Sequence, residues 1–289
     1  MEGTGMDERK SDFAGSWYPG TESECIRMIE DFISGAVSCP DSGTSVGGIV
    51  PHAGWLFSGH IACNVISCIR KTFDPETWVV FGRHLHPSEP FYIMKQGKWT
   101  TPIGALSIDG ALAERVISSH EFRIETGKRY ASDNTIELQL PFIKYFSPDA
   151  MILPVGVPPS PAGIDLGSDI VKVAKSIGRR IAVLGSTDLT HYGYNYGYVP
   201  KGVGPAAVDW VVKENDRRMV DLIVGMDASG VLDEAARNRN ACCAGAVAAA
   251  VSAVGSLGAA GGSELIYATS YDKHKDSNFV GYVGVVFHL

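Results

Sequence analysis

The sequence predicts an α/β fold in which a mostly parallel central sheet is covered by helices on both faces, an α/β/α sandwich. Short apolar runs rich in Val and Ile alternate along the chain with longer segments of helical character. Neither an internal repeat nor a low-complexity linker interrupts this alternation. The 289 residues are therefore expected to form one domain.

The length and composition of each run predict the individual elements, because short apolar runs favour strands and longer periodic segments favour helices. Strands are expected at 46–50, 78–82, 150–157, 181–186, 264–271 and 279–287. Helices are expected at 59–72, 110–119, 134–146, 165–178, 206–225, 228–237 and 241–257. Loops rich in Pro and Gly are expected at 38–48, 156–163 and 193–205, the last with alternating tyrosines that could cover a cleft.

Composition and charge exclude several classes of partner. The net charge is -7, and the basic residues are scattered, which argues against nucleic acid and against an anionic membrane surface. No uninterrupted apolar run reaches about 18 residues, the nearest approach being 241–260, so no transmembrane helix is predicted. Residues 1–12 are polar and lack an apolar signal segment, which favours the cytoplasm. Small molecules or proteins remain as partners, and the oligomeric state is left open.

The six cysteines show no metal-binding or redox spacing of the CxxC type. Adjacent cysteines are poorly placed to bridge each other in regular structure. Free thiols in a reducing compartment are therefore expected for all six, at positions 25, 39, 63, 68, 242 and 243.

Three of the predicted strands end in polar motifs that contain histidine. In open α/β sheets, ligands bind in the crevice outside the carboxyl ends of the strands. The motifs are PHAGW at 51–55, RHLH at 83–86 and STDLTHYG at 186–193. We therefore expect His52, either His84 or His86, and Asp188 with His191 to converge on one crevice.

The segment from Asn240 to Gly245 supplies the fourth element of this predicted site. Asn240 is a good helix N-cap, and a cysteine in the first turn of a helix feels the positive end of the helix dipole, which favours the thiolate. Two imidazoles and one thiolate leave open positions on a metal, as required when oxygen or a substrate must also bind. Cys242 and Cys243 as small core residues are the alternative. No GxSxG, P-loop or GxGxxG motif is present.

Seven ordered motifs resemble the Memo family, whose members resemble class III extradiol dioxygenases in fold. These motifs are FAGSWYP at 13–19, PHAGW at 51–55, the histidines after 82, DNTIELQLPF at 133–142, STDLTHYG at 186–193, the asparagine and cysteine segment at 240–243, and VGYVG at 280–284. The resemblance implies a Memo-like domain over residues 13–289, preceded by a flexible tail over residues 1–12.

The resemblance also implies a metal pocket built from two histidines and a cysteine. Carried over residue by residue, it assigns His52 and Cys243 as ligands, and counting without a gap from Gly82 assigns His86 as the third. It further assigns Asp188 and His191 as catalytic groups beside the metal, with His191 transferring protons.

Other positions of the family pattern either depart from it or suggest outer contacts. Arg83 replaces the usual proline, and Asn134 replaces a family histidine. We expect His84, Glu137 and Trp17 to surround the ligands, although Glu137 as an exposed helical carboxylate and Trp17 as a core residue are the alternatives.

The resemblance implies a metal-dependent redox protein, an oxidase or dioxygenase-like enzyme acting on a small molecule with iron(II) or copper in preference to zinc. A thiolate in place of a carboxylate makes the site softer, so ring-opening chemistry is not simply inherited. Two alternatives remain: an adaptor protein that recognises peptides through the same pocket, and a zinc hydrolase. A basic groove with an aromatic rim would favour the adaptor.

Overall fold

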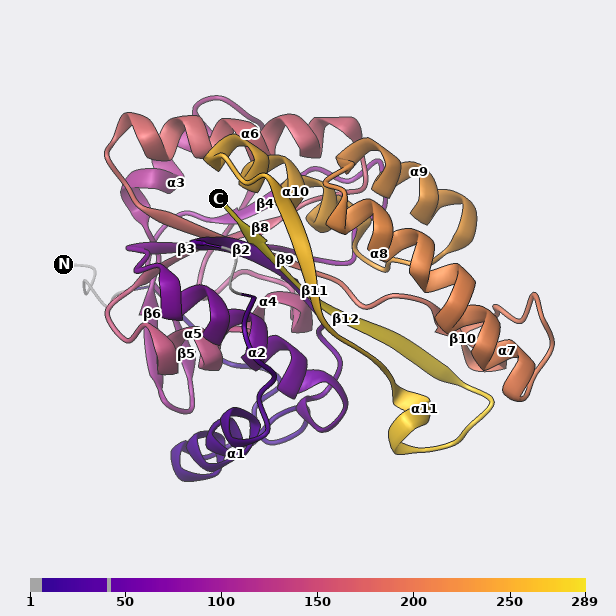
Figure 1. The fold of residues 1–289 in the computed structure, drawn as a ribbon. Helices are drawn as coiled ribbons and strands as arrows, with labels where there is room; N and C mark the ends of the chain where they lie inside the picture. Colours follow the sequence, from indigo (N-terminus) through magenta and orange to yellow (C-terminus); the bar gives the residue numbers. More distant parts are fainter. Residues whose placement is uncertain (1–6, 41–42) are drawn as a thin grey trace.

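The computed structural model describes residues 7–40 and 43–289, which fold around one large mixed β-sheet (Figure 1). The strand order is β10-β12-β2-β9-β3-β8-β4-β7, and β11 pairs with β12. The strands of this sheet are β2 (Ser45–Val50), β3 (Thr77–Gly82), β4 (Phe91–Met94), β7 (Phe122–Glu125), β8 (Met151–Gly156), β9 (Ile181–Ser186), β10 (His191–Tyr192), β11 (Gly261–Thr269) and β12 (Phe279–His288).

The four central strands β2, β9, β3 and β8 are parallel, and β12 and β4 join them antiparallel on either side. All four parallel strands are buried apart from the half-exposed first residue of β8, which explains their nearly continuous apolar sequences. The α/β class and the parallel centre are confirmed, whereas the flanking strands β12 and β4 run antiparallel to that centre, and the edge strand β7 pairs parallel with β4. A small second sheet contains β1 (Glu8–Arg9), β5 (Lys98–Thr101) and β6 (Gly104–Ser107).

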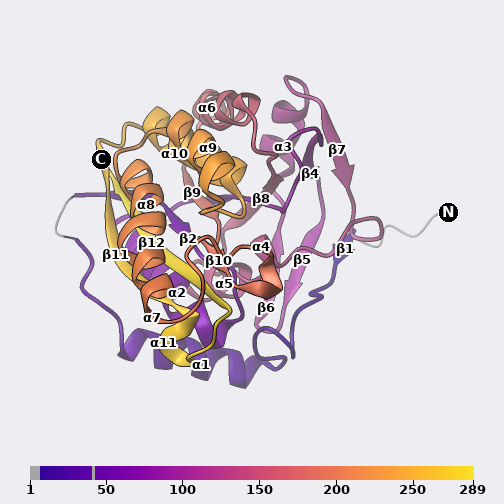
Figure 2. The ribbon, with the colours of Figure 1, turned by 90° about the vertical axis from the view of Figure 1, so that its right-hand side faces the viewer.

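Helices cover both faces of the large sheet, as Figures 1 and 2 show. One layer contains α3 (Gly110–Ile117), α6 (Pro161–Ser176), α8 (Asp216–Val224), α9 (Ala228–Asn238) and α10 (Ala244–Leu257). The opposite layer contains α1 (Glu22–Ser34), α2 (Trp55–Thr72), α4 (Asn134–Glu137) and α5 (Leu140–Phe146). The remaining short helices are η1 (Tyr194–Tyr196), α7 (Pro205–Trp210), the π-turn η2 (Val211–Asn215) and α11 (Ser270–Lys273).

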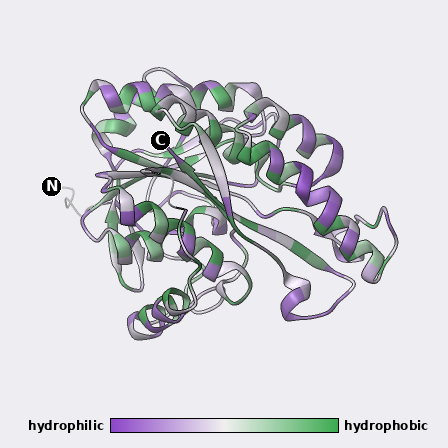
Figure 3. Cartoon of the chain, viewed as in Figure 1, coloured by the Kyte–Doolittle hydropathy of each residue, from purple (hydrophilic) through white to green (hydrophobic). Residues whose placement is uncertain are grey.

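Each helical layer encloses its own apolar core. One core packs α6 and α10 against the sheet, and the other packs α1, α2 and α5 against the opposite face. Figure 3 shows hydrophobic residues concentrated on the central strands and on α10, with hydrophilic residues on outer helices such as α9. The sandwich predicted from the alternation of strands and helices is therefore the observed architecture.

Several element boundaries differ from the sequence-based expectations for local reasons. The helix expected at 59–72 begins at Trp55, directly after the PHAG turn. The helix expected at 134–146 breaks into α4 and α5, with Pro141 near the start of the second. The strands β4–β7 were not predicted, because runs of four mixed residues carry little periodic signal. The 13-residue helix α1 was also missed, although its sequence is amphipathic.

The amino-terminal segment packs against the domain wherever it is described. Arg9 lies in β1, is 1% exposed, and its Nη1 is 3.0 Å from Glu125 Oε2. Of the tail expected over residues 1–12, residues 7–12 therefore belong to the folded domain, and residues 1–6 lie outside the described residues. Likewise, residues 41–42 of the expected loop at 38–48 lie outside the described residues.

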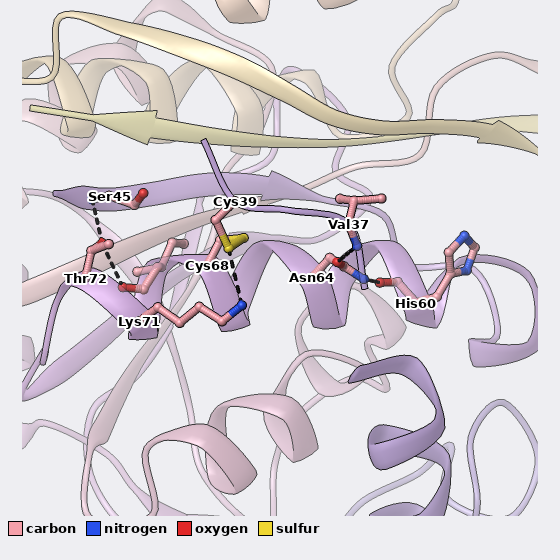
Figure 4. Close-up of a disulfide and its surroundings, with 9 residues drawn as sticks. Val37, Cys39, Ser45, His60, Asn64, Cys68, Lys71 and Thr72 are labelled. Atoms are coloured by element: carbon pink, nitrogen blue, oxygen red, sulfur yellow. Dashed lines mark hydrogen bonds between the residues drawn. A yellow bond between two sulfur atoms is a disulfide. The ribbon is translucent and has the colours of Figure 1, made fainter. Parts of the chain in front are cut away.

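A disulfide corrects the expectation of six free thiols. Cys39 bonds to Cys68 of α2, which fastens the segment before β2 to the helix that follows it (Figure 4). Lys71 Nζ lies 3.6 Å from Cys39 Sγ, and Asn64 accepts a hydrogen bond from the backbone N–H of Val37. The other cysteines, 25, 63, 242 and 243, are free. No helix in the described part of the chain is long and apolar enough to cross a membrane.

Candidate metal centre

The carboxyl ends of β2, β3 and β9 meet at one edge of the sheet. Val50 pairs with Ser186, and Phe81 pairs with Gly185, so the three strands end at nearly the same level. The polar motifs that follow these strands are therefore neighbours in space, as the sequence predicted.

His52 follows β2 and is fixed by a dense set of hydrogen bonds. Its Nδ1 lies 3.0 Å from Ser186 Oγ, and the Ser186 hydroxyl donates its only proton to the carbonyl of Thr135. Ser186 Oγ must therefore accept from Nδ1–H, which leaves Nε2 directed at Cys242 Sγ, 3.2 Å away. Asp188 accepts from the backbone N–H of His52 at 2.8 Å. A neutral His52 thus presents an unprotonated Nε2, as a metal ligand requires.

Cys242 and Cys243 lie immediately before α10, which begins at Ala244. The expected helix start at residue 241 is therefore three residues early, and Asn240 is not its cap. Asn240 instead donates to the carbonyl of Asn215 and to Glu234. Thr187 Oγ1 accepts from the backbone N–H of Cys243 at 3.1 Å, which ties the cysteine segment to the end of β9.

The histidine of FGRHLH that joins this group is His84, and the choice of His86 is corrected. His84 Nδ1 is 3.4 Å from Cys243 Sγ, and its ring meets that of His52 edge-on at a centroid distance of 4.9 Å. His86 is exposed, and its Nδ1 lies 2.8 Å from Ser88 Oγ. Counting without a gap from Gly82 chose His86, but β3 ends at Gly82 and the backbone turns at Arg83 (φ 76°), so sequence position alone does not define which histidine reaches the cluster.

The structure brings four potential metal donors together. One ligand atom from each of His52, His84, Cys242 and Cys243 lies within 4.8 Å of all the others. Of the ligands expected from the sequence, His52 and Cys243 lie in this group, and Cys242 is an additional member that was not assigned. Adjacent residues can both contribute here because the backbone at 242–243 is not yet helical.

Burial and charge give the two thiols opposite pKa shifts. Burial opposes ionisation of Cys242, but hydrogen bonds from Cys243 and His52 and the charge of the His52 imidazolium together lower its pKa well below the usual value. Burial raises the pKa of Cys243, and the adjacent Cys242 thiolate raises it further. Burial would lower the pKa of His52, but the Cys242 thiolate and Asp188 outweigh it and raise the pKa to about 9. Without metal, the cluster therefore contains an imidazolium–thiolate pair.

A cleft of about 740 Å³ opens above this cluster. Its walls combine aromatic, histidine and amide side chains, and none of the lining residues is Lys or Arg. The lining residues central to the site are His52, His84, Asn134, Asp188, His191, Tyr196 and Tyr282, with Trp17, Leu56 and Phe57 among the apolar walls.

Asp188 and His191 both line this cleft, as predicted, but they do not hydrogen-bond to each other. Residues 187–190 are not helical, and Asp188 is 4% exposed with its carboxylate bound to the backbone N–H of His52. Burial raises the pKa of Asp188. The His191 ring packs edge-on against Tyr196 at 5.1 Å. Asp188 is thus arranged to hold His52, and His191 is free to face the cleft.

Glu137 neither surrounds the donors nor lies exposed. Its carboxylate is 0% exposed and accepts from the backbone N–H groups of Asp12 and Phe13 and from the Tyr18 hydroxyl. Burial raises its pKa. Glu137 therefore fixes the segment that carries Trp17, which is 42% exposed and forms part of the cleft wall.

Asn134, which replaces the histidine of the family pattern, both lines the cleft and supports His52. Its side-chain amide donates to the His52 carbonyl at 3.1 Å. Sequence reasoning also missed Ser186 and Thr187, although both belong to the strand-end motif that was singled out. Only the three-dimensional contacts distinguish these supports from the other polar residues of the motif.

The protein is therefore an α/β protein with a mixed central β-sheet and a potential metal site of histidines and cysteines at the carboxyl ends of its parallel strands. A family model described as Memo-like protein matches residues 9–286. The chain belongs to the Memo family, which lies in the class III extradiol dioxygenase-like superfamily.

Curated relatives match almost the whole chain. The MEMO1 family protein of Pyrococcus furiosus is 31% identical over 287 residues, which cover 96% of this chain and 98% of the relative. The MEMO1 family protein of Methanopyrus kandleri is 31% identical over 293 residues, with 97% and 99% covered. A solved structure of an uncharacterised protein from Escherichia coli K12 has a TM-score of 0.48 at 9% identity, covers 83% of this chain and 98% of its own, and supports no further argument.

Proposed function

We propose that this protein is a metal-dependent redox protein that holds iron or copper through His52, His84, Cys242 and Cys243. The observation that carries the proposal is the convergence of two imidazole nitrogens and two sulfurs within 4.8 Å of one another at the base of a cleft. Thiolate and imidazole donors suit copper(I), iron and zinc rather than magnesium or calcium, so the residues fit the proposed metals.

Bound iron or copper would supply one-electron chemistry and, beyond the four protein donors or in place of one of them, a site for oxygen. The chain's own residues would then orient a substrate and move its protons. His191 faces the cleft without a carboxylate partner in hydrogen-bond contact, and its imidazole can accept a proton from a bound substrate. Asp188 holds the backbone of His52 in place rather than acting on the substrate.

The lining of the cleft, which includes Asp188 and Asp276 but no Lys or Arg, favours a small molecule without negative charge that has apolar and hydrogen-bonding parts. Trp17 and Phe57 offer apolar surface, and Asn134, Asn195 and Asn278 offer amide groups. An adaptor that recognises phosphorylated peptides needs fixed positive charge, usually from Arg. The cleft is aromatic at its rim, but no Lys or Arg lines it, which favours the enzyme over the adaptor.

Zinc is the second candidate metal, and the second cysteine favours it. Two thiolates with two imidazoles form the donor set of many structural zinc sites. A zinc hydrolase would need one of these four donors to leave the metal, so that water can bind. The identity of the bound metal therefore distinguishes the redox enzyme from a structural zinc site and from a zinc hydrolase.

Anaerobic purification followed by elemental analysis tests the metal, and oxygen consumption with a reductant and a catechol-like compound tests the chemistry. We expect stoichiometric iron or copper and metal-dependent oxygen uptake. The exposed histidine variant His86→Ala is the matched control and should behave as wild type. Stoichiometric zinc with oxygen-independent hydrolysis of an ester would support the hydrolase, and activity that is unchanged without metal would exclude both enzymes.

His191→Phe tests the proton-transfer role separately. General acid–base catalysis typically contributes about 10²- to 10⁴-fold, so turnover should fall by that order while metal content stays at the wild-type level. Loss of metal would make His191 a ligand, and unchanged turnover would remove it from the mechanism.

The proposed compartment is the cytoplasm. Four free cysteines agree with reducing conditions, whereas the Cys39–Cys68 disulfide is of a kind more common in oxidising compartments. Fractionation of cells of the source organism, with thiol labelling of Cys39 and Cys68 in the isolated protein, tests both points.

A further inference from the structure

Arg83 has a backbone conformation that its position in the fold does not explain. Its φ is 76°, and only two other non-glycine residues of the described chain have positive φ. Those two, Met226 and Arg239, follow helices, where a left-handed residue commonly ends the last turn. Arg83 instead follows β3 and directly precedes His84. For a long side chain this conformation is unfavourable, so the surrounding contacts must maintain it.

Three contacts hold Arg83 in place. Its Nη1 lies 2.6 Å from Glu125 Oε1, and both side chains are only 9% exposed. Its guanidinium lies 4.3 Å from the centroid of the Tyr92 ring, and its backbone N–H donates to Thr135 Oγ1 at 2.7 Å. These partners belong to β7, β4 and α4, so three separate elements fix one residue.

Gly156, at the end of β8, leaves space for the Arg83 side chain. A Cβ atom at this position would collide with Arg83 Cδ and would lie 3.0 Å from Tyr92 Cβ. The path of the Arg83 side chain from the strand end to Glu125 is therefore part of the packing of the sheet edge.

His84 has few supports of its own. It is exposed, and its ring contacts are those with Cys243 and with His52 inside the cluster. The residue before it, Arg83, is anchored. On the other side, the nearest anchored residue is His86, whose backbone N–H donates to Glu89. The direction of the His84 side chain therefore depends on the backbone at Arg83.

We propose that Arg83 is a positioning residue: its anchored, left-handed backbone turns His84 away from the line of β3 and toward the cysteines. The inference rests on the proposed metal centre. A supporting residue outside the ligand set typically changes metal affinity by about 10- to 100-fold, and Arg83 should fall in that range.

The test compares Arg83→Ala with Arg123→Ala by titrating the metal-free protein with Co²⁺ and following the thiolate-to-metal absorption. Arg123 is a matched control, because it also lies over Tyr92, at 5.3 Å, and donates to the Tyr92 hydroxyl, but it is not adjacent to a donor. We expect Arg83→Ala to weaken Co²⁺ binding by about 10- to 100-fold and to alter the absorption, Arg83→Lys to recover part of the loss, and Arg123→Ala to match wild type. Equal affinity and equal spectra for Arg83→Ala and wild type would overturn the proposal.

Two further measurements separate this inference from the metal proposal and from a loss of folding. In a His84→Ala background, adding Arg83→Ala should cause no further loss of Co²⁺ affinity, whereas a general structural effect would add to it. In the metal-free protein, the NMR signals of the His84 imidazole should move in Arg83→Ala and stay in place in Arg123→Ala. Wild-type protein that binds no Co²⁺ would reject the metal centre alone; unmoved His84 signals in Arg83→Ala would reject the positioning role.

Discussion

The loops after β2 and β3 each deliver one histidine to the cluster, and they hold it in opposite ways. His52 is 2% exposed and is fixed directly, by Ser186 at its ring and by Asp188 and Asn134 at its backbone. His84 is exposed and depends on the neighbouring Arg83, whose side chain reaches Glu125. One donor is thus part of the protein core, and the other is held by a contact that lies outside the cleft.

A metal site can therefore combine a rigid half, here His52, with an adjustable half, here His84. The rigid half couples metal binding to the stability of the core, whereas the adjustable half lets a donor move without unfolding the sheet. Four experiments, from the largest to the smallest expected effect on metal affinity, test whether the two halves differ in this way.

Removing the adjustable donor should have the largest effect. His84→Ala should weaken metal binding by more than about 100-fold, because losing a ligand costs more than losing a supporting contact. Its thermal stability should change little, because the side chain is exposed. Equilibrium dialysis with copper or iron measures the affinity. His86→Ala, two residues away and also exposed, should bind metal as wild type does; the reverse pattern would restore His86 as the ligand.

Loosening the rigid donor should have an intermediate effect. Ser186→Ala removes the acceptor of the His52 Nδ1–H, so the ring loses its fixed tautomer and metal affinity should fall by about 10- to 100-fold. The buried carbonyl of Thr135 also loses a donor, so the unfolding free energy should fall by about 1–3 kcal/mol. Competition with a chelator and urea denaturation measure the two quantities. A loss of stability without a loss of affinity would show that Ser186 supports the fold alone.

Changing the pH should alter metal affinity by about tenfold per pH unit for each proton that metal binding releases. The pKa of His52 is raised to about 9, so at neutral pH the metal-free protein carries a proton that a metal must displace. The Cys243 thiol, whose pKa is raised, must also lose its proton when it binds the metal. Affinity should therefore rise steeply with pH up to about pH 9 and more gently above it, because His52 then loses its proton unaided while Cys243 does not. Chelator competition at pH 7, 8 and 9 measures this slope. A pH-independent affinity would mean that the metal displaces no proton from His52 or from Cys243.

Opening the disulfide should have the smallest effect on metal binding. Cys39 and Cys68 are 29 residues apart, and closing a loop of that length is worth about 3–4 kcal/mol in the chain-entropy model. Cys39→Ser should lower the free energy of unfolding by about that amount, while metal affinity stays at the wild-type value. Urea denaturation with and without a reductant tests this, because reduction should affect wild type and leave Cys39→Ser unchanged. A loss of metal in Cys39→Ser would show that the β2 side is less rigid than its contacts indicate.

The sequence predicted the parallel centre of the sheet and the meeting of its strand-end motifs because both depend on local patterns. Apolar runs identify buried strands, and the carboxyl ends of parallel strands must share an edge. His52 and Asp188 were found in this way. The expected helix after Asn240 was also present, although it begins at Ala244.

The choice between His84 and His86 could not be made from local patterns. Strand alternation would have grouped the two histidines, but the left-handed turn at Arg83 ends that alternation. The turn is maintained by Glu125 and Tyr92, which are distant in sequence and lie on short strands that carry no clear signal. The pairing of Cys39 with Cys68 was missed for a related reason, since spacing alone does not define which cysteines meet.

The hydrogen bonds of the buried Glu137 carboxylate also determine when the amino-terminal segment can reach its final position during synthesis. Its partners Asp12 and Phe13 leave the ribosome 125 and 124 residues before it. At a synthesis rate of about 5–20 residues per second, the segment that carries Trp17 must wait about 6–25 s for the group that fixes it. During that interval the aromatic wall of the cleft is incomplete. Because Val280 and Tyr282 also line the cleft, its final shape is reached only when nearly the whole polypeptide has been made.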